Sequence, residues 1–298
     1  MQTCCFKCGL EITDGKRWHG LHHECFKQWF SLSSLEEFKN IASHHQSDNP
    51  VNNRSINSSF FHGKFRKYSS TLGGCKYILK VVEQDYPELP ITEYLCNQIF
   101  KSLNINVPPF HLIFFEEKHF CFVTRNFMED FPDSSLVHIY HFLESDMLYN
   151  CENLLRIIEK KTGRINAKED FIYLTLADSL IGNNDRHGRN LGLIQTPKGF
   201  ILSPFYDNPS YLGVEITSLL GADHQPAGAI STQSVSNPTM KDYIHEWERL
   251  GFGDVVERFR KAVSLENIQA LIKSSYLIPK RKEALLRLLS KRHKELCG

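Results

Sequence analysis

The stretch Leu180–Ile194, which reads LIGNNDRHGRNLGLI, decides how this chain is interpreted. An apolar helical pattern leads into it, and a strand pattern leads out of it. The polar loop between them holds Asp185 and, at the fifth position after it, Asn190. This is the D-x-x-x-x-N spacing of a protein-kinase catalytic loop, in which the Asp reaches the acceptor hydroxyl and the Asn turns back to Mg²⁺. Alone, such a loop is more often an ordinary polar turn. The segments around it must therefore decide between a turn and a catalytic loop.

The segments on either side of this loop favour the kinase interpretation. A predicted hairpin follows it and leads to Ser203–Asn208, where Asp207 stands at a strand end as a second metal-binding carboxylate would. Upstream, the strand pattern Tyr77–Val81 places Lys80 inside an apolar run, and a lysine there is costly unless it is paired. In kinases this lysine holds the nucleotide phosphates.

A helix is predicted next, with Thr92 as a candidate cap and Glu93 in its first turn. Glu93 either complements the helix dipole or is the partner of Lys80. The strand patterns 109–115 and 119–125 then predict a hairpin that ends at Asn126 and Phe127. In a kinase this exit would hold the adenine. The following pattern is mostly helical, and Asp178 is expected to be a buried hydrogen-bonding anchor.

The composition is that of a globular protein with a large core. The chain has 298 residues, of which 41% are hydrophobic and 23% charged, and its net charge is +1. No apolar run reaches the length of a membrane span, and the start lacks a signal-peptide hydrophobic region. Nine cysteines, four of them before residue 26, suit a reducing compartment and one metal cluster better than a disulfide framework. We therefore expect no membrane partner and a cytoplasmic location, with export as an effector left open.

Cys5 and Cys8 form a C-x-x-C pair, and His22 and Cys25 form an H-x-x-C pair. Two such pairs supply the four ligands of a tetrahedral Zn²⁺. Possible substitutes are the neighbouring residues Cys4, His19 and His23. Four protein ligands would leave no open position for a substrate, so a structural zinc site is predicted, against the alternative of a reduced N-terminal arm.

Three further segments of the chain carry weaker signals. Residues 31–54 are polar and predict a linker, with a short helix over 33–43. Beyond residue 240 the pattern is helical, and it ends in the basic clusters 280–282 and 291–294. These are expected to be a solvated helix face or a contact for an acidic partner or nucleic acid. Lys64, Arg66 and Lys67 are interpreted as part of a phosphate-covering loop or of an exposed hairpin face.

Taken together, the chain resembles the HipA family of bacterial serine/threonine kinases, the toxins of HipBA-type toxin–antitoxin modules. The resemblance rests on three motifs and their order: Thr92–Cys96 followed by Val107–Pro108, then Gly182–Asn190, then Ser203–Asp207. The stretch Gly63–Ser69 is similar to the family's Gly-rich loop in degraded form, with Phe65 where relatives usually have Gln. The cysteine-bearing start resembles a leader of some members.

The resemblance implies roles for individual residues. Asp185 would be the catalytic base, Asn190 and Asp207 would bind Mg²⁺, and Lys80 would contact the ATP phosphates, with Gly63 in the covering loop. Family members phosphorylate a serine of that loop in themselves and so silence the kinase. Here Ser58 and Ser59 lie nearest to that position, with Ser55 and Ser69 as alternatives.

The resemblance also implies partners. The known substrates in the family are aminoacyl-tRNA synthetases. Larger HipA proteins carry an N-terminal subdomain that this chain has no room for, so it looks like the short HipT form. A separate HipS-like small protein and a HipB-like helix-turn-helix antitoxin are the implied partners, and DNA is bound only indirectly, through the antitoxin.

The resulting prediction is an α+β, two-lobed protein-kinase-like fold. It has a zinc-binding module over 1–30, a linker over 31–54, a β-rich ATP-binding lobe over 55–127 and a helical lobe over 128–298. ATP and Mg²⁺ would bind in the cleft. Two alternatives are a catalytically inactive kinase fold that acts as a binding module, and a zinc-bearing nucleic-acid-binding protein, which the small net charge disfavours.

Overall fold

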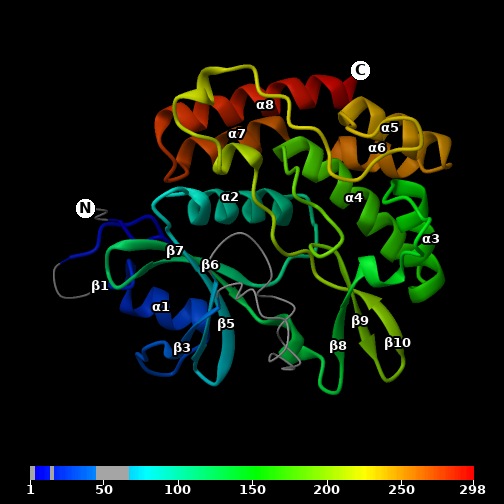
Figure 1. Ribbon diagram of the computed structural model, residues 1–298. Coiled ribbons are helices and arrows are strands. Elements are labelled where there is room, and N and C mark those ends of the chain that lie inside the picture. The colour runs from blue at the N-terminus through cyan, green and yellow to red at the C-terminus, as the bar shows by residue number, and fades with distance from the viewer. Residues whose placement is uncertain (1–3, 14–16, 45–66) are drawn as a thin grey trace. The chain divides into compact units, whose positions relative to one another are not determined.

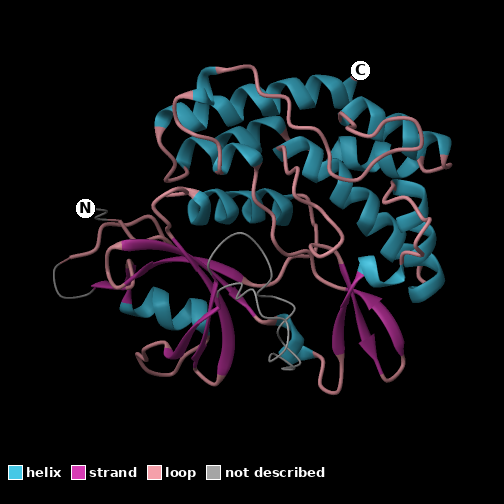
Figure 2. Ribbon diagram, in the orientation of Figure 1, coloured by secondary structure: helices cyan, strands magenta, loops and turns pink. Residues whose placement is uncertain are grey.

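The computed structural model describes residues 4–13, 17–44 and 67–298 of the chain (Figures 1 and 2). It is a mixed α+β structure, as predicted, and it divides into two compact units. Unit 1 comprises Met1–Tyr94 and Pro108–Pro132, and unit 2 comprises Leu95–Val107 and Asp133–Gly298. The predicted loop residues Ser58, Ser59 and Gly63 lie outside the described residues.

Unit 1 is built on a five-stranded antiparallel sheet with the strand order β3-β4-β5-β7-β6. Its strands are β3 (Lys39–His44), β4 (Lys67–Leu72), β5 (Cys75–Val81), β6 (Phe110–Phe115) and β7 (His119–Arg125). Gly73 and Gly74 join β4 to β5 with φ angles of 57° and 79°, which is the two-residue turn that suits the twist of a hairpin. The predicted hairpin of β6 and β7 is confirmed.

Ahead of the sheet lie two short strands, β1 (Arg17–Trp18) and β2 (Leu21–His22), and the helix α1 (His23–Phe30). The helix predicted over 33–43 is wrong, because Lys39–His44 is the strand β3 and pairs with β4. Phe38 explains the difference. It is buried and packs on Phe30 of α1 and Tyr77 of β5, so tertiary contacts outweigh local helix propensity in a segment that was expected to be a linker.

The helix α2 (Leu89–Ser102) begins earlier than predicted. Thr92 therefore does not cap it; its hydroxyl donates to the carbonyl of Glu88. Glu93 consequently lies beyond the first turn, so the expectation that it complements the helix dipole there is wrong. The 3₁₀ turn η2 (Phe127–Asp130) follows β7 and completes unit 1.

Unit 2 is mainly helical. Its helices are α3 (Cys151–Thr162), α4 (Ile165–Ile181), α5 (Met240–Arg249), α6 (Gly253–Ala262), α7 (Leu265–Ser274) and α8 (Pro279–Cys297). A small antiparallel sheet, ordered β10-β9-β8, contains β8 (Ser135–His138), β9 (Gly192–Thr196) and β10 (Gly199–Leu202). Three 3₁₀ turns complete it: η3 (Ile139–Phe142), η4 (Tyr211–Gly213) and η5 (Leu219–Gly221).

The helix α4 is the centre of this unit, because it is buried on nearly all sides and leads directly into the loop with Asp185. Its Phe171 meets Trp247 of α5 edge to face, and the Trp247 indole N–H donates to the Thr175 hydroxyl at 3.0 Å. A partner for the indole N–H is what allows a tryptophan to be fully buried. α4, which was predicted to lead into the loop of Asp185, is therefore held in place by packing against α5.

Two basic residues of α8 differ from the expected solvated face, whereas Lys280 and Lys294 are exposed as expected. Arg281 and Arg292 are buried, with exposed fractions of 2% and 0%. Arg281 donates to the carbonyls of Leu212 and Glu215, and Arg292 donates to that of Pro226. The segment that follows Asp207 is thus bound along α8 through its backbone.

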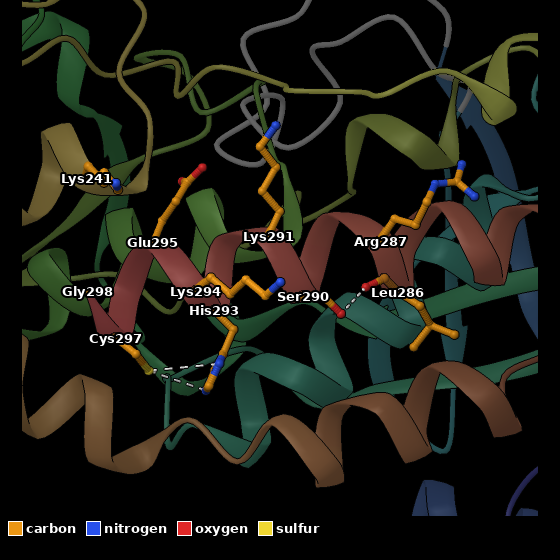
Figure 3. Close-up of a pocket in the computed structure, with 10 residues that line it drawn as sticks. All are labelled: Lys241, Leu286, Arg287, Ser290, Lys291, His293, Lys294, Glu295, Cys297 and Gly298. Atoms are coloured by element: carbon orange, nitrogen blue, oxygen red, sulfur yellow. Dashed lines mark hydrogen bonds between the residues drawn. The ribbon is translucent and has the colours of Figure 1, made fainter.

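The end of α8 keeps some basic side chains at the surface. With Lys241 of α5 they line an open depression of about 900 Å³ (Figure 3). Arg287, Lys291 and Lys294 are its other cations, and Glu295 is its carboxylate. Within the described parts of the chain, no helix has the length and apolar character needed to cross a membrane.

Candidate active site and metal cluster

Lys80 and Glu93 form the buried ion pair that the sequence predicted. The Lys80 ammonium lies 2.5 and 2.7 Å from the two Glu93 carboxylate oxygens, and the side chains are 7% and 2% exposed. The ammonium also lies 5.8 Å from the centre of the Phe122 ring on β7. Removing two charges from water costs several kcal/mol per ion. A pair kept despite that cost is more typical of a functional site than of stability alone.

A second buried lysine lies beside this pair. Lys67 is 4% exposed and directly opposes Lys80 in the β4–β5 ladder, so the two side chains leave the same face of the sheet. Lys67 is therefore not on an exposed hairpin face. Like charges at opposed positions repel, and the Glu93 carboxylate beside Lys80 offsets part of this repulsion. The sequence signal was a lysine at the end of the degraded Gly-rich loop.

The loop after α4 brings Asp185 and Asn190 together. The helix ends at Gly182, which has a φ of 70°, and the Asn183 side chain then binds Asp178 and accepts from the backbone N–H of Asp185. The Asn190 amide donates to the Asp185 carbonyl at 2.7 Å and to its carboxylate at 3.3 Å. The Asp185 side chain is 56% exposed. A fixed backbone thus presents an accessible carboxylate.

Arg186 is the centre of a hydrogen-bond network beneath this loop, and the sequence analysis did not identify it. It is fully buried, and its guanidinium binds both carboxylate oxygens of Asp178 at 2.8 and 3.0 Å. It also donates to the carbonyls of Asn190 and Tyr206 and to the Asn208 side chain. The expectation that Asp178 is a buried anchor is confirmed. Arg186 therefore holds the Asp185 loop and the Asp207 segment together.

Electrostatics in this network favour the charged form of Arg186. Burial alone would lower its pKa, but the charge and hydrogen bonds of Asp178 raise it above the ordinary value, with smaller contributions from Tyr149 and Asp207. A guanidinium is suited to this position because its planar fork binds a carboxylate in two places.

Asp207 lies between two residues of the network and has a strained backbone. Its φ is 53°, in the left-handed region that residues other than glycine seldom adopt. Its neighbour Asn208 is completely buried and donates to Asn97 of α2 and to the Phe205 carbonyl. Such strain persists only where the surroundings enforce it, and it is common at active sites.

The predicted hinge residues Asn126 and Phe127 follow β7 and are both buried. The Asn126 side chain caps η2 by accepting from Met128 N–H, and its own N–H donates to the Lys76 carbonyl. These bonds fix the exit of the hairpin. The Asn126 side chain uses its oxygen in this cap, and its amide NH2 group and the backbone remain as groups that could contact an adenine.

Cys5, Cys8, His22 and Cys25 form the predicted cluster. Their ligand atoms all lie within 4.8 Å of one another, and His22 Nδ1 is 3.4 Å from Cys8 Sγ and 3.8 Å from Cys25 Sγ. His22 Nε2 lies 3.0 Å from the Glu11 carbonyl, so it donates there and leaves Nδ1 for a metal. Three thiols and an imidazole suit Zn²⁺. The substitutes Cys4, His19 and His23 do not belong to this cluster.

The thiols also differ in acidity. Burial raises the pKa of Cys25 to about 12, and the neighbouring Cys5 and Cys8 act in the same direction. Burial likewise raises the pKa of Cys5, but the backbone N–H groups of Cys8, His22 and Lys7 outweigh it and bring it to about 7. Backbone N–H groups that point at a thiol stabilise the thiolate, which is the form that binds a metal. All nine cysteines lie in the described residues, and none is in a disulfide.

Comparisons with known proteins show similarity in sequence and in fold. The family model for the HipA-like C-terminal domain matches residues 53–273. A curated relative, the serine/threonine-protein kinase toxin HipA of Shewanella oneidensis, is 25% identical over 178 residues, which are 50% of this chain and 40% of the relative. The chain thus spans well under two thirds of that relative's length.

Two solved structures share the fold. The proinflammatory kinase CtkA of Helicobacter pylori matches with a TM-score of 0.65 at 18% identity, over 79% of this chain and 89% of CtkA. A chain from the Shewanella oneidensis complex of HipA, HipB and operator DNA matches with a TM-score of 0.54 at 17% identity, over 76% and 59% of the two chains. The family model covers well over half of the sequence, and the chain therefore belongs to the HipA-like kinase family.

Proposed function

We propose that this chain is an ATP- and Mg²⁺-dependent serine/threonine protein kinase and the toxin of a toxin–antitoxin module. The observation that carries this proposal is the buried Arg186 network, which joins the loop of Asp185 and Asn190 to the strained Asp207 segment. A structural polar turn does not need such a network, whereas phosphoryl transfer depends on exact positioning of its groups.

The residues fit the groups that such a kinase binds. Asn190 and Asp207 offer amide and carboxylate oxygens, which are the ligands Mg²⁺ prefers. Mg²⁺ would neutralise the charge of the ATP phosphates, and Lys80, oriented by Glu93, would bind them. Gly63, Asn126 and Phe127 would complete the nucleotide site. Asp185 would accept the proton of the acceptor hydroxyl, since its carboxylate is exposed on a fixed loop.

Regulation and partners follow from the family. We propose that the kinase silences itself by phosphorylating Ser58 or Ser59, and that its substrate is a translation component such as an aminoacyl-tRNA synthetase. Its partners would be a HipB-like antitoxin, which would contact the DNA, and a HipS-like small protein, as in the short HipT form. The nine reduced cysteines support a cytoplasmic location.

The Cys5, Cys8, His22 and Cys25 cluster would hold one structural Zn²⁺. The support is the four-ligand set and the hydrogen bond that fixes the His22 tautomer. Protein purified without a polyhistidine tag should contain about one zinc per chain by elemental analysis. A metal content near zero would end this proposal without affecting the kinase proposal.

The decisive experiment maps phosphate on the purified protein and on its Asp185→Asn variant by mass spectrometry, and then compares their ATP turnover after a phosphatase has removed any silencing phosphate. We expect phosphate on Ser58 or Ser59 in the wild type, and phosphoryl transfer reduced by about 10²–10⁴-fold in Asp185→Asn, because a general base contributes that much. Asp207→Asn should be similarly inactive. Asp146→Asn, an exposed aspartate elsewhere in unit 2, is the matched control and should behave as the wild type.

Two outcomes would contradict the proposal. A folded Asp185→Asn protein that keeps most of its activity would remove Asp185 as the base. A folded wild type that transfers no phosphate to itself or to any acceptor would favour the alternative, a catalytically inactive kinase fold that acts as a binding module.

A further inference from the structure

The residues around the cysteine cluster bind the edge strand β6 of the unit 1 sheet. β6 is the last strand of the order β3-β4-β5-β7-β6, and its Phe114 N–H donates to the His19 carbonyl at 2.9 Å. The His19 ring Nδ1 lies 2.9 Å from the Phe114 carbonyl. His19 thus satisfies both backbone groups of Phe114, which an edge strand would otherwise leave open. Arg17 adds an ion pair to Glu117 in the turn after β6.

On one face of the sheet, the contact is made by Phe6, which lies between Cys5 and Cys8. Its ring centre is 4.8 Å from that of Phe114 and 5.7 Å from that of Phe120. Phe120 and Phe122 are two residues apart in β7, and Phe122 directly opposes Lys80. Side chains alternate between faces along a strand. Phe6 therefore covers the face that carries Lys80, one row of side chains away from it.

On the other face, the contact is made by α1. Phe30 packs on Tyr77 of β5 and on His111 of β6, with ring centres 5.5 and 4.6 Å apart. Tyr77 is three residues from Lys80 in β5, and His111 is three residues from Phe114 in β6. An odd separation along a strand places two side chains on opposite faces. α1 and Phe6 therefore lie on opposite sides of the same sheet edge.

The cluster links the Phe6 segment on one face of the sheet to α1 on the other face. Cys5 and Cys8 flank Phe6, His22 and Cys25 bracket the start of α1, and His19 lies between them at the edge of β6. We call residues 5–13 and 17–30 the edge clip. Gly20 shows how closely it is fitted, since a Cβ there would lie 2.3 Å from the Phe6 ring and 2.9 Å from Phe114.

We propose that Zn²⁺ in this cluster closes the edge clip around β6 and thereby sets the nucleotide affinity of the Lys80 site. The inference rests on the proposed zinc site and on the proposed phosphate-binding role of Lys80. Metal binding brings its ligands together at the moment of folding. With zinc bound, Phe6 supports Phe120, and the adjoining Phe122 supports Lys80 in its pair with Glu93. Without zinc, the Phe6 segment and α1 separate, and Phe6 no longer packs on Phe120.

The test compares zinc content, amide hydrogen exchange and binding of a non-hydrolysable ATP analogue with Mg²⁺. Cys8→Ser removes a ligand. We expect it to hold little zinc, to exchange the amides of β6 and β7 at least tenfold faster, and to bind the analogue at least tenfold more weakly. Exchange in α4 of unit 2 should not change. Cys4→Ser, next to the cluster but outside it, is the matched control and should match the wild type in all three measurements.

A second variant covers the case in which Cys8→Ser does not fold. Phe6→Leu keeps every zinc ligand and removes only the ring that packs on Phe114 and Phe120. It should therefore retain zinc, yet show faster amide exchange in β7 and weaker binding of the analogue. If zinc-depleted or Phe6→Leu protein shows unchanged amide exchange in β6 and β7, the proposal that the edge clip stabilises this edge of the sheet is overturned. If exchange responds but analogue affinity does not, the link to the Lys80 site is overturned. Wild-type protein that binds no analogue would instead count against the proposed kinase, while exchange still decides on the clip.

Discussion

Arg186 shows how much of the proposed chemistry depends on one side chain that never touches a substrate in this arrangement. It is 1% exposed, and its guanidinium binds Asp178, Asn208 and the carbonyls of Asn190 and Tyr206. Each of these partners belongs to the loop of Asp185, to the helix before it or to the segment of Asp207. Losing the guanidinium would leave the Asp178 carboxylate buried without its main cation.

Arg186→Met should therefore destabilise unit 2 by about 3–5 kcal/mol, the usual cost of breaking a buried ion pair from one side. Arg186→Lys should recover part of the stability but little activity, because an ammonium cannot form the two-pronged contact with Asp178. Urea unfolding and phosphoryl transfer measure the two effects. The control is Arg189→Met, an exposed arginine three residues later. Equal losses in the two Met variants would show that the network has no special role.

At this scale, the sequence revealed the residues whose spacing carries the chemistry. Asp185 and Asn190 were predicted as neighbours and lie in contact, and Lys80 and Glu93 were predicted as a pair and form one. Arg186 was missed as a site residue, and the burial of Lys67, which was interpreted as part of a phosphate-covering loop or of an exposed hairpin face, was not predicted; both have a physical reason. Their importance comes from burial and from partners distant in sequence, such as Asn208 for Arg186, and no local spacing encodes these.

At the scale of elements, α8 acts as a binding strip for the segment after Asp207. Arg281 binds the Leu212 and Glu215 carbonyls, Arg287 that of Leu220 and Arg292 that of Pro226. The donors recur along one helix, and the acceptors follow in the same order along the segment. The segment is therefore ordered by permanent arginine contacts, of the kind that a phosphate group provides in kinases whose activation loop needs phosphorylation.

Arg292→Met should release the far end of this segment. Because the Pro226 carbonyl would lose a buried donor, we expect a loss of about 1–3 kcal/mol in unfolding free energy. Amides over 219–225 should also exchange faster, and activity should fall without a change in zinc content. Lys294→Met, at an exposed position two residues further on, is the control. If both variants show the same exchange over 219–225, Arg292 does not hold the segment.

Elements were predictable where periodicity was strong. The hairpin of β6 and β7, the helix α4 and the hairpin of β9 and β10 all appear where the apolar patterns placed them. β3 was taken for a helix because its sequence, Lys39–His44, has no strand alternation, and it becomes a strand only by pairing with β4. The basic end of α8 was predicted to be a solvated face or a contact for a partner. Lys294 is exposed, but charge alone could not predict that Arg281 and Arg292 bind backbone carbonyls.

At the scale of the whole molecule, the family model matches only part of the chain. The match covers residues 53–273, so the edge clip lies before it and α8 (Pro279–Cys297) lies after it. The edge clip contacts the sheet that contains Lys80 in unit 1, and α8 binds the segment after Asp207 in unit 2. These contacts are the basis of the proposal that the edge clip and α8 position Lys80 and Asp207, whose roles in the chemistry are themselves proposed.

Charge over the whole molecule bears on the remaining alternative, direct binding of nucleic acid. The net charge is only +1, and the most basic helix uses Arg281 and Arg292 internally. The cations that remain near its end are Lys241, Arg287, Lys291 and Lys294, around the open depression of Figure 3. Two of these already have partners, since Arg287 binds the Leu220 carbonyl and Lys291 lies 3.4 Å from Asp223. Around this depression, little positive charge is therefore left to displace counterions from a duplex.

We therefore expect the isolated chain to bind duplex DNA more weakly than about 100 µM at physiological salt, the weak end of non-specific binding. Fluorescence anisotropy with a labelled duplex measures this at several salt concentrations. If the depression did follow a backbone through four cations, the affinity would fall with salt at a log–log slope of about −3.6, and Lys291→Glu with Lys294→Glu would flatten it. Tight binding with that slope in the wild type, lost in the double variant, would show that the chain contacts DNA itself. Weak binding that both proteins share would leave DNA contact to a separate partner.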